Sequence, residues 1–86
     1  MTIELFSEVA LARDLPEHGL RQGDVATVVE QLPATKASGG EAGYILEVFN
    51  AVGETIALVT VPVSAVEPLT ATEVLSVRPL RTDEAP

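Results

Sequence analysis

Three potential metal ligands lie within five positions of one another: Asp14, Glu17 and His18. Carboxylate and imidazole groups bind divalent metals, and His18 is the single histidine of the chain. A tight site needs a defined ligand number and geometry, and one imidazole beside two carboxylates arises readily by chance. We therefore expect an exposed turn in which Asp14 caps backbone N–H groups. A small metal protein or enzyme centred on His18 remains an alternative.

Nucleophilic catalysis would need a serine or a similar nucleophile beside a base that a third group orients. His18 is the only conventional base, and no serine stands at a strand-to-helix elbow. The segment 35–40 contains Lys36 and two glycines, but it lacks the Gly-x-x-x-x-Gly-Lys-Ser/Thr order of a phosphate-binding loop. The sequence therefore predicts a protein that is not an enzyme, with no catalytic residue, no metal site and no cofactor.

The charge of the chain limits its partners. Its 86 residues carry a formal net charge of −8. The few basic residues are scattered along the sequence: Arg13, Arg21, Lys36, Arg78 and Arg81. Nucleic acids and anionic membranes are bound through positive charge, so an acidic surface repels both. We expect no nucleic-acid partner and no membrane partner, whereas a basic protein partner is compatible with the charge.

The location of the protein is predicted from what the sequence lacks. There is no cysteine, which excludes disulfides and fits a reducing compartment. No apolar run approaches the roughly 18 residues that a membrane span needs. The first residues, 1–4, lack the basic region that begins a signal peptide. We expect a cytoplasmic protein.

The remaining pattern favours an all-β domain. We predict strands at residues 9–12, 25–32, 44–50 and 55–61, and a short closing strand at 67–69, from their β-branched and apolar residues and the Gly and Pro residues between them. Residues 14–24 and 34–42 are expected to be loops, the second flexible and a candidate for disorder. A four-residue hairpin loop is predicted at 51–54, and a single 3₁₀ turn at 63–66.

Residues 70–86 form a C-terminal extension beyond the predicted domain of residues 1–69. Thr70 and Glu73 match the Thr-x-x-Glu capping box that begins many helices. Val74, Val77 and Pro79 disfavour a helix, and an added strand at residues 74–77 is the alternative. Residues 81–86 are expected to be disordered, as chain ends commonly are.

One run of loop and strand resembles a known family. Residues 14–20, Asp-Leu-Pro-Glu-His-Gly-Leu, and residues 23–30, Gly-Asp-Val-Ala-Thr-Val-Val-Glu, resemble the DUF4926 family of small bacterial domains of unknown function. Segments 44–49, 57–61 and 63–69 are similar to the second half of that family. The resemblance covers about residues 5–69. It implies a five-stranded SH3-like, partly open barrel, and it implies no catalytic residue.

The hairpin of residues 44–61 is apolar on both faces, although one face of a small barrel should be polar. Ile56 and Leu58 would lie on one face of its second strand, and Ala57, Val59 and Val61 on the other. Something must cover the outward face: the tail, a second copy of the chain or a different protein. The predicted interface is Tyr44, Ile45, Phe49, Ala57, Val59, Val61, Val74 and Val77.

These observations favour a non-catalytic protein-interaction module whose partner is a protein or a second copy of itself. A small acidic antitoxin or inhibitor of a basic toxin or nuclease would be one instance. The alternatives are a nucleic-acid-binding SH3-like barrel, against which the charge argues, and the His18-centred protein described above.

Overall fold

The fold is all-β in the computed structural model, which describes residues 3–37 and 39–80. Helical structure among these residues is limited to two short 3₁₀ turns. In chain order the elements are β1 (Glu8–Leu11), η1 (Pro16–His18), β2 (Val25–Leu32), β3 (Gly43–Phe49), β4 (Thr55–Pro62), η2 (Val63–Ala65) and β5 (Val66–Pro68).

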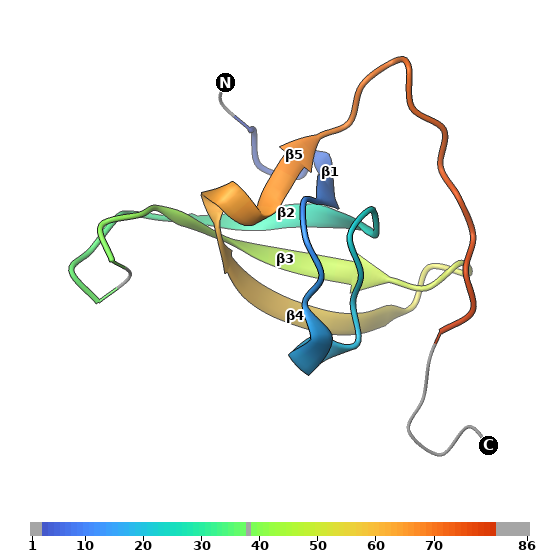
Figure 1. The fold of residues 1–86 in the computed structure, drawn as a ribbon, viewed down its shortest axis with the longest axis horizontal. Helices are drawn as coiled ribbons and strands as arrows, with labels where there is room; N and C mark the ends of the chain where they lie inside the picture. Colours follow the sequence, from blue (N-terminus) through green and yellow to red (C-terminus); the bar gives the residue numbers. More distant parts are fainter. Residues whose placement is uncertain (1–2, 38, 81–86) are drawn as a thin grey trace.

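The five strands form one antiparallel sheet in the order β4-β3-β2-β1-β5. Figure 1 shows β2, β3 and β4 curving side by side, with β1 and β5 crossing above them. β4 and β5 are the two edges and do not pair with each other, so the sheet is not closed into a barrel. The prediction of a five-stranded, partly open all-β fold is confirmed, and its SH3-like assignment stays a prediction.

The strands follow the β-branched segments of the sequence closely. β2 has the predicted bounds, β3 begins and ends one residue earlier than predicted, and β4 ends one residue later than predicted. β1 begins one residue early because Glu8 already pairs with Thr27, and β5 begins at Val66 because that residue pairs with Leu11. The starts of β1 and β5 are therefore set by pairing between strands, which residue propensity does not encode.

The loop between β1 and β2 contains a second 3₁₀ turn, η1, where only one such turn was predicted in the chain. Pro16 starts the turn with a fixed φ, and Gly19 ends it in the left-handed region at φ 70°. Leu15 and Leu20 bridge the loop through two backbone hydrogen bonds of 2.9 and 3.1 Å. Both leucines are thereby buried in the core.

The core consists almost wholly of aliphatic side chains, and the described residues include no buried polar or charged one. Its members are Ile3, Val9, Leu11, Leu15, Leu20, Ala26, Val28, Tyr44, Leu46, Val48, Val59, Val61, Ala65 and Val66. Leu11, Leu46, Val9 and Val28 are the largest of the fully buried side chains. β1, β2, β3 and β4 thus each point alternate residues into one shared interior.

The segments outside the sheet are held by turns. In the 34–42 loop, Gly39 N donates to Lys36 O at 3.1 Å and Gly40 N to Thr35 O at 2.8 Å. In the extension, Thr70 N donates to a Glu73 carboxylate oxygen at 2.7 Å, which is half of a capping box. No helix or strand follows in residues 70–80, so neither predicted tail element forms there. The prediction for residues 81–86 lies outside the described residues.

Candidate functional site

The outer surface of the sheet is defined by strand alternation. In β3 the buried side chains are Tyr44, Leu46 and Val48, so Ile45, Glu47 and Phe49 point outward. The register places Ile45 opposite Thr60 and Glu47 opposite Leu58. A bulge where β3 meets β4 leaves Ile56 without a partner in β3.

Four apolar side chains on this surface form what we call the outer patch: Ile45, Phe49, Ile56 and Leu58. Leu58 is 63% exposed and Phe49 42% exposed, while Ile45 is half-buried. Glu47 lies between them, and its carboxylate accepts a hydrogen bond from the Thr55 hydroxyl at 2.5 Å. The outer patch is therefore a partly exposed apolar surface, and the hydrogen-bonded carboxylate of Glu47 lies at its centre.

Every charged residue in the five strands is a glutamate, and all of them point outward. They are Glu8, Glu30, Glu47 and Glu67. Thr27 pairs with both Glu8 and Glu47, so these glutamates share one outward row with Leu58. Glu30 pairs with Ile45, and Glu67 with the outward-facing Ala10. Among the residues that the structure describes, lysine and arginine occur only in the loops and the tail. The outer surface of the sheet is consequently acidic as well as apolar.

The structure divides the predicted interface residues into three groups. Tyr44, Val59 and Val61 are buried in the core, and Ala57 is half-buried against it. These four side chains therefore belong to the interior side of the sheet. Ile45 and Phe49 lie in the outer patch, as the prediction of an outward apolar face requires. Val74 and Val77 lie on the tail and are 89% and 90% exposed.

The described part of the tail leaves the outer patch uncovered, because its own apolar side chains are exposed. Tail packing was one of the three covers considered from the sequence. The predicted interface does not include Ile56 and Leu58, although the sequence places them together on one face of the strand. Their signal was ambiguous, since both faces of β4 are apolar and alternation alone does not say which is buried.

The residues first considered for metal chemistry are all exposed. The Asp14 carboxylate accepts a hydrogen bond from the Gln22 N–H at 2.8 Å, which fits its expected capping role. Within residues 3–37 and 39–80, no three His, Cys, Asp or Glu side chains gather as a metal site would require. An open groove of about 560 Å³ lies elsewhere, between the end of β2 and the start of β3, and is lined mainly by apolar groups and backbone.

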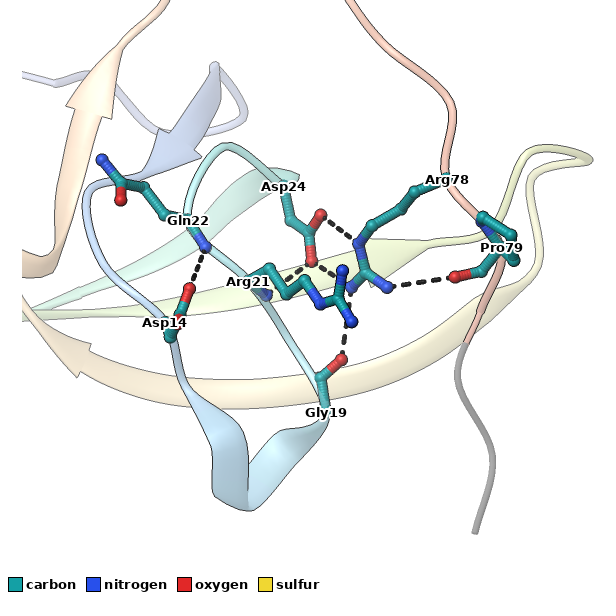
Figure 2. A network of polar contacts seen from close by, with 7 residues as sticks. All are labelled: Asp14, Gly19, Arg21, Gln22, Asp24, Arg78 and Pro79. Atoms are coloured by element: carbon teal, nitrogen blue, oxygen red, sulfur yellow. Dashed lines mark hydrogen bonds and ion pairs between the residues drawn. The ribbon is translucent and has the colours of Figure 1, made fainter. Parts of the chain in front are cut away.

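A polar network joins the tail to the start of β2 (Figure 2). Arg78 donates from Nε to Asp24 Oδ1 at 2.9 Å and from Nη2 to Asp24 Oδ2 at 2.5 Å. Nη2 also donates to the Gly19 carbonyl at 3.2 Å. The Arg78 hydrogen bond lowers the pKa of the Asp24 carboxyl below its ordinary value, against an opposing effect of burial; the Arg21 N–H lowers it further. The tail is therefore anchored at one point by a two-pronged ion pair.

Phe6 has a backbone conformation that sequence reasoning missed. Its φ is 66°, in the left-handed region, and its side chain is 72% exposed. The turn is held because Phe6 N donates to Val28 O at 2.5 Å and the Ser7 hydroxyl donates to Glu4 O at 2.6 Å. A β-strand-forming aromatic residue gives no sequence signal for a conformation that favours glycine.

Among the described residues, no helix has the length and apolar character needed to cross a bilayer.

Comparison with known proteins identifies a family and no individual relative. No curated protein and no solved structure matches the chain. A family model described as a domain of unknown function, DUF4926, matches residues 5–68, which is more than half of the 86 residues. The match spans every strand and the whole outer patch. This chain therefore belongs to the DUF4926 family.

Proposed function

We propose that this protein is a non-catalytic interaction module that binds a basic, partly apolar protein surface on its outer patch. The observation that carries the proposal is the joint placement of exposed apolar side chains and glutamates on one surface. Leu58 and Phe49 offer apolar contact area, Glu47 lies among the apolar side chains, and Glu30 lies beside Ile45 at the rim. A cationic partner would pair with both glutamates and would bury the apolar side chains around them.

The charge of the whole chain supports the same partner. At −8, the protein attracts a cationic surface over distances of about 10 Å and repels an acidic one. An inhibitor of a basic toxin or nuclease would be one instance of this class. The apolar side chains supply affinity that survives salt, whereas the glutamates supply orientation and the rate of encounter.

The test is a nuclear magnetic resonance titration of the full chain with a synthetic peptide of alternating lysine and leucine. We expect chemical-shift changes concentrated at Ile45, Phe49 and Leu58. Glu30→Lys should weaken binding by about threefold or more, as rim charges do. Glu17→Lys changes the net charge equally but lies on η1, and should weaken binding less.

Two results would count against the proposal. If Glu30→Lys and Glu17→Lys lose the same amount of affinity, the net charge alone would account for the binding. Shift changes that avoid the outer patch, or equal binding of a peptide of alternating glutamate and leucine, would remove the patch from the interaction.

A further inference from the structure

The β4 strand is an edge whose bulge at Ile56 and whose proline, Pro62, lie toward its two ends, so that the stretch between them, Ala57–Val61, has neither device. Its partner on one side is β3, and in the described part of the chain no backbone hydrogen bond reaches its other side. Eight residues, Thr55–Pro62, form this edge, and none of them is charged. Monomeric proteins commonly protect such edges with lysine, inward charges or covering loops.

The other edge of the sheet differs. β5 has only three residues, Val66–Pro68, one of which is Glu67 and another a proline that has no N–H to donate. Joining two copies there would set Glu67 of one beside Glu67 of the other, about 5 Å away. Short length, charge and proline are the usual means by which an edge avoids pairing.

We propose that two copies of this protein associate through β4, edge to edge and antiparallel about a two-fold axis, into one ten-stranded sheet. The inference does not depend on the basic partner proposed above. A symmetric antiparallel pair centred on Leu58 sets residues 55–61 opposite one another, all of them aliphatic or threonine, and one centred on Val59 adds Pro62 opposite Ile56. Each copy then supplies the hydrogen bonds that the other lacks.

The distribution of charge fits this seam. Each copy carries −8, so a dimer is possible only where the two sets of carboxylates stay apart. β4 is the one strand without a glutamate. The nearest strand glutamates, Glu47 on each β3, would be separated by three strand spacings, or about 14 Å. That exceeds the Debye length of about 8 Å at physiological salt, so their repulsion is largely screened.

Leu58 provides the decisive experiment, because it is exposed and lies near the proposed axis. The wild-type chain should show a dimer mass by sedimentation equilibrium. Leu58→Glu and Leu58→Lys should each weaken that dimer by at least about tenfold, since like charges then meet across the seam. Mixing the two variants should restore a dimer containing one of each. Restoration requires residue 58 of one copy to lie beside residue 58 of the other.

The tail gives the matched control. Val74→Glu alters the charge of the chain as Leu58→Glu does, at an apolar side chain that is more exposed, and should leave the dimer intact. A monomeric wild type over the whole concentration range would overturn the inference. So would a dimer that survives both Leu58 variants, or one that Val74→Glu disrupts, because the seam would then lie elsewhere. None of these outcomes bears on peptide binding by the outer patch.

Discussion

Arg78 and Asp24 are 54 residues apart in sequence and form a two-pronged ion pair, with Nη2 2.5 Å from Oδ2. Asp24 immediately precedes β2, and Arg78 belongs to the extension that lies beyond the family match. Both side chains are partly buried, at 19% and 25% exposure, so solvent screens the pair less than a surface pair. The ion pair attaches the tail to the start of β2, although the tail forms no strand or helix in residues 70–80.

Acid should release this contact. The folded pKa of Asp24 is lowered from its ordinary 3.8, chiefly by the Arg78 hydrogen bond. A depressed folded pKa contributes stability that is present above the unfolded pKa and is lost as the pH falls through the folded one. The tail should therefore loosen below pH 3.8, and Arg78→Ala should bring the Asp24 pKa back toward that value.

Carboxyl-detected magnetic resonance of Asp24 measures this pKa, and backbone relaxation of residues 74–80 measures the tail. Arg78→Lys serves as the comparison, because a lysine keeps the charge but lacks the planar fork that contacts both carboxylate oxygens. An Asp24 pKa unchanged by Arg78→Ala would show that the pair does not form in solution.

The same substitution at two neighbouring residues of β4 should destabilise the fold at one and leave it folded at the other. Val59 is 2% exposed in the core, whereas Leu58 is 63% exposed. Val59→Asp buries a carboxylate without a partner and should abolish folding or cost at least about 3 kcal/mol. Leu58→Asp should remain folded. Circular dichroism and urea denaturation distinguish the two, and equal effects would mean that the faces of β4 are assigned the wrong way round.

Phe6 should be replaceable by glycine without loss of stability. The left-handed region costs a non-glycine residue about 1–2 kcal/mol, and the mostly exposed ring returns little of it. We expect Phe6→Gly to leave the free energy of unfolding unchanged or to raise it by about 1 kcal/mol. Leu5→Gly, next to it but without a positive φ, should lower stability. A clear loss in Phe6→Gly would show that the ring is held by contacts.

Gly43 should tolerate no side chain. A Cβ at this position would lie 2.8 Å from the Val61 carbonyl oxygen, which is backbone of the neighbouring strand and cannot move aside alone. Gly43→Ala should therefore cost about 1–3 kcal/mol, as overpacking does. Urea denaturation checks this, and an unchanged midpoint would mean that β3 and β4 separate easily at that end.

The strand positions could be read from the sequence because β2, β3 and β4 are β-branched segments bounded by proline, glycine or asparagine. The direction of their side chains could not. Both faces of the strands that carry Tyr44, Val59 and Val61 are apolar. Alternation is therefore compatible with either face being the buried one. Only packing of β1 and the Leu15–Leu20 bridge over one side decides which face is buried.

The contacts that join distant segments had no sequence signal at all. Arg78 and Asp24 are ordinary charged residues, and their pairing depends on where the extension runs after β5. The unusual φ of Phe6 likewise depends on hydrogen bonds to Val28 and within the turn. The outward placement of all four strand glutamates is partly predictable from the sequence. It follows from alternation once the buried face of the sheet is known.

The strand order has a consequence for how the chain acquires its fold during synthesis. β2, β3 and β4 are neighbours in sequence and in the sheet, so they can pair as soon as they are made. β1 pairs with β2 on one side, but its other side waits for β5, because Leu11 pairs with Val66 near the far end of the domain. Ala65 and Val66 are core residues that arrive late. A nascent chain that ends before them is a four-stranded meander with an open interior, and the second side of β1 is paired only when β5 emerges.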